Sequence, residues 1–373
     1  MQLVSFVEPM SISVQRSTGQ HVVNFQANTP YVISNANFKN LYQDIKKNVF
    51  KITVYDWRMT NFNVAAVKKG EPVLYFNGSG GFGDQITSWP VANILHKLGF
   101  EVHIMAELGL EQCWWHFPWV KSIVPSPISQ GQLEMWKHMA FMEAVVNFDE
   151  HQDQLHPIDV QLKKFGIDPA TIDPALKCVT PIFTPGEVQQ AEKVRGGVKK
   201  LGIYQLASTS PIRSLGIDQS VSTLSALATR FPDVAWIAIY DAFISNELVE
   251  KAKSLGHPNV RILSFESLRV LWAVIAISDI CVGPDSLIIH VAGTMGTPTV
   301  GMWGSMPPSS RTRYYKNHVP IWHQNKCQFS PCFVSTHAFP PYCPPTQDPR
   351  TVCAVIGAIS WEEVCDAASK ALG

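Results

Sequence analysis

Charged residues are scarce in this sequence, and long apolar runs are absent. Lys, Arg, Asp and Glu make up 16% of the 373 residues, and their formal charges cancel to zero. This balance weighs against broad, non-specific binding of polyanions, although a local basic groove stays compatible with it. No apolar run reaches the roughly 18–20 residues of a membrane-spanning helix, so we expect no membrane span.

The beginning of the sequence lacks a basic start followed by an apolar core, which is the pattern of a secretory leader. We therefore expect a cytoplasmic protein. Apolar residues are abundant, at 46% of the chain, which is typical of a soluble globular protein with a large buried fraction. A chain of 373 residues is too long for one ordinary core, so we expect two or three domains.

The pattern of residues changes along the chain and predicts four parts. Residues 1–70 show short alternations broken by turn residues, which favours a small, mostly β module. Residues 71–198 and 199–322 each alternate buried strands with helical periodicity, which predicts two doubly wound, Rossmann-like α/β domains facing a cleft. Residues 323–373 hold a Cys- and Pro-rich loop and a closing amphipathic helix, which Ser360 can cap.

A glycine-rich turn, GSGGFGD, follows the first strand of residues 71–198 and ends in Asp84. It lacks the spacing of a dinucleotide-binding fingerprint. Glycine permits close backbone approach, and a carboxylate at the carboxyl end of a parallel strand can take a proton from a hydroxyl as a general base. The alternative is that Asp84 only caps the following helix.

Two further polar stretches follow strands of residues 199–322. In LASTSPIRS, the hydroxyls of Ser208 and Thr209 can donate to phosphate oxygens and Arg213 can neutralise them, unless the stretch is an ordinary Ser/Pro turn.

In PDSLIIHVAGTMGTPTVGMWG, Ser286 and the neighbouring N–H groups begin a helix, which is an anion site. Asp285 can accept hydrogen bonds from sugar hydroxyls, and His290 lies one turn later on the same face or is a packed core histidine.

Together these stretches resemble the bacterial ADP-heptose heptosyltransferase family. The last stretch resembles the family's donor signature, Asp-Ser/Thr-Gly-x-x-His-x-Ala-Gly followed by Gly-x-Pro. FGD together with WP resembles its catalytic segment. LASTSPIRS resembles its phosphate-binding segment. The resemblance extends over residues 71–310. It implies a GT-B fold and inverting transfer from a nucleoside-diphosphate sugar, with an ADP-linked donor favoured and no catalytic metal.

The resemblance also implies roles for individual residues. Asp84 would be the general base, in a domain that binds the acceptor, and Asp285 would hold the donor sugar. The residues expected to hold the diphosphate are Ser208, Thr209, Arg213 and Ser286. A further acid in the donor site would be Asp241 or Glu247.

Two positions depart from the family pattern. Leu287 stands where the family has Gly, so a side chain crowds the donor, although its N–H can still bind. Arg213 stands where Lys is usual, and its planar guanidinium is bulkier. Both departures bear on the identity of the donor sugar. His290 matches the His of the signature.

Four of the eight cysteines crowd together with the spacing C-x4-C-x10-C-x9-C. They are Cys327, Cys332, Cys343 and Cys353. Four thiolates suit a tetrahedral structural metal site, with His323 and His337 as substitute ligands; the alternative is unpaired cysteines that are neighbours only in sequence. One branch of the resembled family, which glycosylates bacterial adhesins, has a β N-terminal module and a four-Cys finger that holds a metal, and this chain looks like it. The metal would be zinc or iron.

A cluster of aromatic side chains either packs in the core or stacks on a sugar. Its members are Trp114, Trp115, His116, Phe117 and Trp119. The acceptor stays open between a saccharide, a protein Ser and a modified nucleic-acid base, and a homo-oligomer is a further expectation. Two other functions remain alternatives: a GT-B nucleotide-sugar epimerase, and a non-catalytic sugar-nucleotide-binding or assembly protein.

Overall fold

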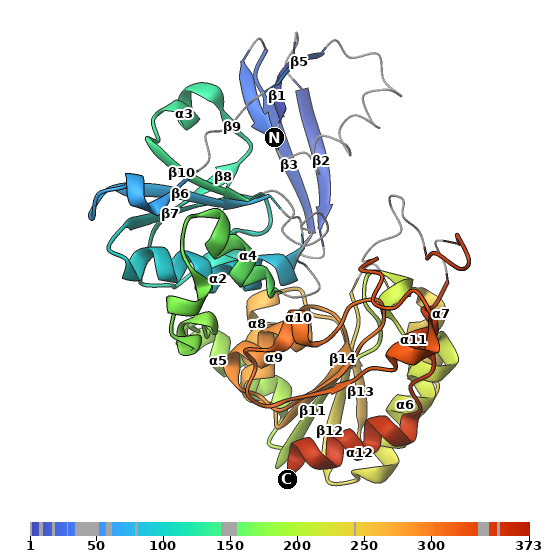
Figure 1. The fold of residues 1–373 in the computed structure, drawn as a ribbon. Coiled ribbons are helices and arrows are strands. Elements are labelled where there is room, and N and C mark those ends of the chain that lie inside the picture. Colours follow the sequence, from blue (N-terminus) through green and yellow to red (C-terminus); the bar gives the residue numbers. More distant parts are fainter. Residues whose placement is uncertain are drawn as a thin grey trace. The chain divides into compact units, whose positions relative to one another are not determined.

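The computed structural model describes residues 2–6, 10–16, 19–27, 29–33, 52–56, 62–78, 81–142, 155–241, 244–334, 343–348 and 351–373. The chain forms two compact units, each treated by itself below (Figure 1). Unit 1 comprises Met1–Asp149 and Pro157–Ile182, and unit 2 comprises Glu150–His156 and Phe183–Gly373.

These units differ from the expected parts in two respects. Unit 2 begins at Phe183 rather than at residue 199, because helix α5 (Pro185–Arg195) packs against α8 (Leu268–Ala276). Residues 1–70 belong to unit 1, since strand β4 (Pro30–Ile33) pairs with β9 (Ile128–Ser129).

Unit 1 contains a mostly antiparallel region and a parallel sheet. In the first region, β5-β1-β4-β9 form one sheet and β2-β3 form a hairpin-like pair. The parallel sheet has the order β10-β6-β7-β8, so the first strand of the series, β6, lies between the second and the fourth. The remaining strands are β1 (Gln2–Phe6), β2 (Met10–Arg16), β3 (Gly19–Phe25), β5 (Ile52–Asp56), β6 (Pro72–Asn77), β7 (Glu101–Glu107), β8 (Val120–Ser126) and β10 (His138–Met142). The α-helices are α2 (Phe82–Lys97), α3 (Gln130–Glu134) and α4 (Pro157–Lys164).

Unit 2 is built on one six-stranded parallel sheet with the order β13-β12-β11-β14-β15-β16. This is the doubly wound order 3-2-1-4-5-6, in which the strand order reverses between the first and fourth strands. The strands are β11 (Lys200–Gln205), β12 (Val234–Ile239), β13 (Val260–Leu263), β14 (Ile280–Pro284), β15 (Thr299–Met302) and β16 (His318–Ile321). The other helices are α6 (Ile217–Arg230), α7 (Asn246–Lys253), α9 (Leu287–Met295), α10 (Ser309–Thr312), α11 (Ala354–Gly357) and α12 (Trp361–Leu372).

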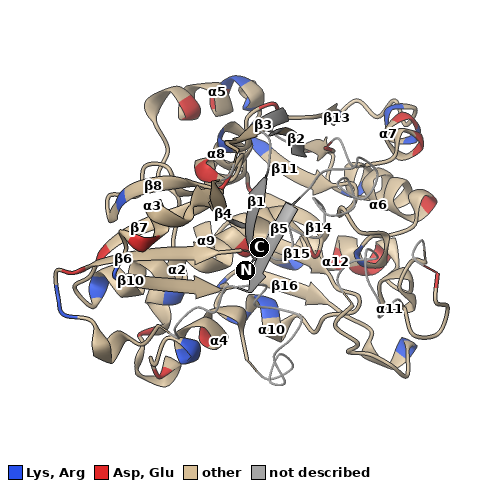
Figure 2. Ribbon diagram, turned by 90° about the horizontal axis from the view of Figure 1, so that it is seen from above, with Lys and Arg blue, Asp and Glu red and all other residues tan. Residues whose placement is uncertain are grey.

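Helices cover both faces of this sheet. In Figure 1, α5, α8 and α9 lie on one face and α6 and α12 on the other, and α6 contacts α12 directly. The predicted cap of the last helix is confirmed, because Ser360 and Glu363 form a reciprocal capping box. Basic and acidic residues are interspersed along the ribbon rather than gathered by sign, which fits the zero net charge (Figure 2).

Candidate functional site

The candidate donor site lies where the strand order of the unit 2 sheet reverses. Strands β11 and β14 are neighbours in this sheet, and both run in the same direction. The polar stretches 206–214 and 285–290 therefore leave the same edge side by side. In doubly wound sheets this position is where ligands bind, beyond the carboxyl ends of the strands. The fold thus brings together two of the stretches that the sequence singled out.

Serine side chains fix the loop after β11. Ser208 N–H donates to Ser214 Oγ at 2.9 Å, and Ser210 N–H donates to Ser208 Oγ at 3.3 Å. Ser208 is buried, whereas Thr209 is exposed. Of the two predicted phosphate-binding hydroxyls, Ser208 therefore holds the loop together and Thr209 faces solvent.

The same loop holds two buried polar atoms with no hydrogen-bond partner among the described residues. They are Ser210 Oγ and Arg213 Nε. A buried donor without a partner is costly, so such groups are typical of sites that a ligand or water completes. Ser210 was not singled out by sequence, although it belongs to the same hydroxyl run as Ser208 and Thr209.

The loop after β14 leads into helix α9, whose N-terminus is not capped by a side chain. Ser286 is its N-cap residue in an extended conformation, but the side chain makes no capping bond. Its hydroxyl donates instead to Oε1 of Gln205, the last residue of β11. The first N–H groups of an α-helix have no acceptor within the helix, so those beginning at half-buried Leu287 are available to an anion.

Asp285 is the charged centre of this site. Its carboxylate lies 3.8 Å from Arg213 Nη1 and 3.4 Å from His290 Nε2, and Arg213 also donates to the Asp285 carbonyl at 3.2 Å. Burial raises the pKa of Asp285, but the hydrogen bond from His290 and the charge of Arg213 outweigh burial and lower it from 3.8 to about 2. Asp285 is therefore a buried carboxylate that stays ionised and can accept hydrogen bonds.

His290 is buried and lies beside Asp285. It is 6% exposed, as a core histidine would be, and its second ring nitrogen, Nδ1, lies 3.0 Å from the Tyr315 hydroxyl. The ring thus bridges Tyr315 and Asp285, which fixes its orientation beside the carboxylate.

The two candidate acids of the β12 region differ in position. Asp241 follows β12, which neighbours β11 in the sheet, so it lies at the same edge as the donor loops. Glu247 is exposed in the first turn of α7. The topology therefore favours Asp241 over Glu247.

In unit 1, Asp84 lies in the first turn of α2, directly after β6. The interpretation of Asp84 as the helix cap is wrong, because Gly81 is the N-cap residue. Asp84 Oδ2 would lie 2.7 Å from a Cβ placed on Gly81, so the carboxylate folds back over the helix start. The Asp84 carbonyl accepts from Asn77 Nδ2 at 3.1 Å, which ties this turn to the end of β6.

The aromatic segment after β7 is divided between core and surface. Trp114 and Phe117 are 1% and 4% exposed, whereas Trp115 between them is 46% exposed. His116 has a φ of 69°, in the left-handed region that costs a non-glycine residue on the order of 1 kcal/mol. Core packing therefore holds for Trp114 and Phe117, whereas Trp115 is exposed.

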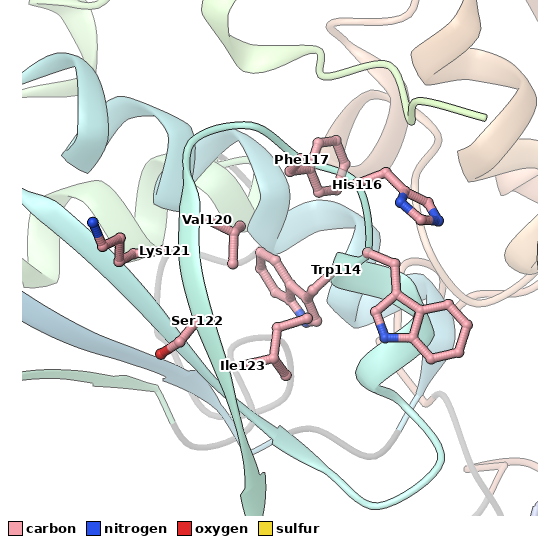
Figure 3. A pocket seen from close by; sticks show the side chains of 8 residues that line it. Trp114, His116, Phe117, Val120, Lys121, Ser122 and Ile123 are labelled. Atoms are coloured by element: carbon pink, nitrogen blue, oxygen red, sulfur yellow. The ribbon is translucent and has the colours of Figure 1, made fainter. Parts of the chain in front are cut away.

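A pocket of about 320 Å³ opens at this segment (Figure 3). Its lining includes Trp114, Trp115, His116 and Phe117 together with residues 120–123 of β8. In Figure 3, Val120 and Ile123 lie toward Trp114, whereas Lys121 points away from it.

The four cysteines pack on the same core of unit 2. Cys343 and Cys353 are buried within it, and Cys327 and Cys332 are half-buried against it. Over the described part of the chain, no group of three or more His, Cys, Asp or Glu side chains is arranged to hold a metal ion. His323 contacts Glu363 at 2.9 Å, and the other substitute ligand, His337, lies outside the described residues.

Comparison with known proteins finds one family profile and several similar solved structures. Residues 240–343 match the profile of glycosyltransferase family 9 (heptosyltransferase). No curated protein matches the sequence significantly. Among solved structures, the chain is similar to the ADP-heptose LPS heptosyltransferase II of E. coli, with 12% identity, a TM-score of 0.58, and 81% of this chain and 98% of that chain covered.

Two other solved structures are similar. A glycosyl transferase of family 9 from Veillonella parvula has 12% identity and a TM-score of 0.61, with 84% of this chain and 98% of that chain covered. The iron-containing dodecameric glycosyltransferase TibC from enterotoxigenic E. coli has 13% identity and a TM-score of 0.57, with 82% of this chain and 80% of that chain covered.

These findings confirm the predicted resemblance to the heptosyltransferase family and the α/β fold of the GT-B type. They support a glycosyltransferase. Among the described residues, no helix has the length and apolar character needed to span a membrane.

Proposed function

We propose that this protein transfers a heptose or related sugar from a nucleoside-diphosphate sugar, with an ADP-linked donor favoured, to an acceptor hydroxyl. The observation that carries the proposal is the donor site at the β11/β14 edge. There, an uncapped helix start, the unpartnered atoms of Ser210 and Arg213, and ionised Asp285 lie together. The N–H groups and the arginine suit a diphosphate, and the carboxylate beside them suits sugar hydroxyls. Together they match the two halves of a nucleoside-diphosphate sugar.

The reaction follows from these groups. The acceptor oxygen attacks the anomeric carbon and gives its proton to the Asp84 carboxylate. The bond between the anomeric carbon and the diphosphate oxygen breaks, and the nucleoside diphosphate leaves with the electron pair. Arg213 and the α9 N–H groups stabilise the negative charge that develops on it. Attack opposite the leaving group inverts the anomeric centre, and no step uses a metal.

Binding of the donor is tested by thermal stability with ADP-, UDP-, GDP- and CMP-linked sugars, since a ligand that binds the folded state raises the midpoint. We expect a rise with one nucleotide that Arg213→Ala with Ser286→Ala abolishes. Arg230→Ala is the matched control, because Arg230 is a surface residue of the same unit with a 60% exposed side chain. If the nucleotide sugar raised the unfolding midpoint of all variants equally, it would bind elsewhere.

Catalysis is tested with Asp84→Asn. We expect donor binding to persist while nucleoside-diphosphate release in the presence of acceptor falls by roughly 100-fold or more, because removal of a general base removes its rate contribution. Full activity in Asp84→Asn would contradict the mechanism. Binding without any turnover in the wild type would favour the assembly-protein alternative, and an epimerised nucleotide sugar would favour the epimerase.

We also propose that Cys327, Cys332, Cys343 and Cys353 hold a structural zinc or iron. Support comes from their chemistry and grouping, because all four thiols pack on one core. The similar protein TibC is described as iron-containing. Elemental analysis of the purified chain should find about one metal per chain, lost in the four-Ser variant. A metal-free wild type would contradict the proposal.

The self-association of the chain stays a prediction. TibC is described as a dodecamer. Light scattering of the purified chain would show an assembly larger than the 41.5 kDa monomer if the same tendency holds here. A mass equal to that of the monomer would refute it.

A further inference from the structure

We propose that Tyr315 is a positioning residue for the donor sugar, because its hydroxyl holds His290 in the tautomer that donates a hydrogen bond to Asp285. This inference rests on the proposed glycosyl transfer. It adds a residue that acts through His290 rather than by contact with the sugar.

Three side chains of unit 2 form a chain of contacts that ends at the donor edge. The Tyr315 hydroxyl lies 3.0 Å from His290 Nδ1, and His290 Nε2 lies 3.4 Å from Asp285 Oδ1. The exposed fractions of Tyr315, His290 and Asp285 are 9%, 6% and 5%. Polar groups buried to this degree depend on their partners, so the loss of one contact in the chain changes the others.

The direction of each hydrogen bond follows from the charge of the carboxylate. Although burial raises the pKa of Asp285, the hydrogen bond from His290 and the charge of Arg213 bring it down to about 2. An ionised carboxylate can only accept, so His290 Nε2 carries the proton of their contact. In a neutral ring Nδ1 then carries no proton and can only accept, which makes the Tyr315 hydroxyl the donor.

The surrounding charges favour a neutral His290. Arg213 and Arg311 both act on the Asp285 carboxylate, and two cations oppose the formation of a third beside them. Burial, with His290 nearby, lowers the pKa of His318 to about 4, so the His318 ring is uncharged at pH 7. Asp285 is therefore balanced without a charge on His290.

The Tyr315 ring is fixed against helix α9 beside His290. A Cβ on Gly293 would lie 2.3 Å from Tyr315 Cδ2, so the ring lies directly on the helix backbone one turn after His290. Glycine inside a helix is less favourable than alanine by about 1 kcal/mol, and here it leaves the room that the tyrosine occupies. The Tyr315 N–H donates to the Thr312 carbonyl at 2.8 Å, which closes the turn after α10.

The other histidine beside Tyr315 is engaged elsewhere. The rings of His318 and Tyr315 meet edge-on, with centroids 6.5 Å apart. His318 Nδ1 lies 2.7 Å from Thr299 Oγ1, and His318 Nε2 accepts from the Trp303 indole N–H at 3.3 Å. Both nitrogens of His318 thus have partners, which leaves the Tyr315 hydroxyl to His290.

This arrangement should matter for the sugar half of the donor only. A carboxylate with one oxygen held by His290 presents its lone pairs in a fixed direction, and such preorganisation favours hydrogen bonds from sugar hydroxyls. ADP has no sugar beyond its ribose, so its binding does not depend on this orientation. Loss of the Tyr315 hydroxyl should therefore weaken the use of a nucleotide sugar and spare the binding of ADP.

Kinetics of the full chain with ADP-heptose, and calorimetry with ADP, test this separation. Tyr315→Phe should lower kcat/KM for ADP-heptose by roughly 3- to 10-fold, the value of one hydrogen bond, and leave the Kd of ADP unchanged. Tyr204→Phe is the matched control, because Tyr204 is also buried in unit 2 and its hydroxyl donates to the Ser220 carbonyl at 3.0 Å. In a His290→Ala background, Tyr315→Phe should have no further effect on kcat/KM, since Tyr315 acts through His290.

NMR of the chain with isotope-labelled histidine reads the tautomer directly. The His290 signals, identified by their loss in His290→Ala, should show a protonated Nε2 and an unprotonated Nδ1 at pH 7. Tyr315→Phe should shift the Nδ1 signal toward that of a protonated nitrogen, because the hydroxyl that occupied its lone pair is gone.

Four results would each overturn this inference alone. They are a protonated Nδ1 in the wild type, unchanged ADP-heptose kinetics in Tyr315→Phe, an equal loss in Tyr204→Phe, and a further loss on adding Tyr315→Phe to His290→Ala. A wild type that binds neither ADP nor ADP-heptose would refute the proposed function itself.

Discussion

Replacing Asp285 by Asn should remove a pH-dependent part of the stability of unit 2. Asn keeps the shape of the side chain but loses the negative charge that contacts Arg213 and His290. The folded-state pKa of Asp285, about 2, lies below its ordinary value of 3.8. Each factor of ten in proton affinity is worth about 1.4 kcal/mol, so the ionised carboxylate contributes roughly 2 kcal/mol.

The direction of the pH dependence follows from the lowered pKa. The stabilisation is fully present above the unfolded-state pKa and is lost as the pH falls from about 5 toward the folded-state pKa of about 2. At pH 7 the Asp285→Asn variant should therefore be less stable than the wild type by roughly 2 kcal/mol. The difference should shrink steadily below pH 5.

Urea unfolding of the full chain, followed by tryptophan fluorescence between pH 7 and pH 3, measures this difference. Asp366→Asn is the control, because Asp366 has a 68% exposed side chain and lies 3.8 Å from Arg230 at the surface. We expect almost no effect there, since exposed ion pairs contribute little. An Asp285→Asn variant whose stability relative to the wild type is the same at every pH would refute the reasoning.

Two further substitutions, with one control variant, test the packing of unit 2 by urea unfolding. A Cβ on Gly293 would lie 2.3 Å from the Tyr315 ring, so Gly293→Ala should lower the free energy of unfolding by about 1–3 kcal/mol. Gly357→Ala is the control, because a Cβ there would lie 3.5 Å from its nearest neighbour and should lower that free energy much less. Arg195 donates to three carbonyls, including that of Ile277 at 2.9 Å, so Arg195→Lys should destabilise by roughly 2 kcal/mol because an ammonium cannot reach all three. Equal effects of the two glycine variants, or a neutral Arg195→Lys, would contradict the described packing.

The sequence was sufficient to predict that two polar stretches meet at one edge of the sheet, because its signals are local. Buried apolar runs identify β11 and β14, and polar residues follow each run directly. The general rule that ligands bind beyond the carboxyl ends of parallel strands then places Arg213 and Asp285 at one edge. Their observed separation of 3.8 Å agrees with this prediction.

Long-range partners could not be predicted in the same way. The contact between Ser286 and Gln205 joins residues 81 positions apart, and the pairing of Tyr31 with Ser129 joins the N-terminal strands to a later segment. Neither pair has a local pattern that specifies its partner. The alternative in which Asp84 caps α2 is wrong: Asp is a stronger capping signal than Gly, but the helix already begins at the residue after Gly81.

The central claim is that a nucleoside diphosphate binds at the β11/β14 edge, and calorimetric titration with ADP tests it most directly. We predict saturable binding to the wild type and to Arg230→Ala. Binding to Arg213→Ala should be weaker by roughly 10- to 100-fold, the value of a charge-assisted hydrogen bond. Undiminished binding to Arg213→Ala, or no binding of ADP to the wild type, would contradict the account.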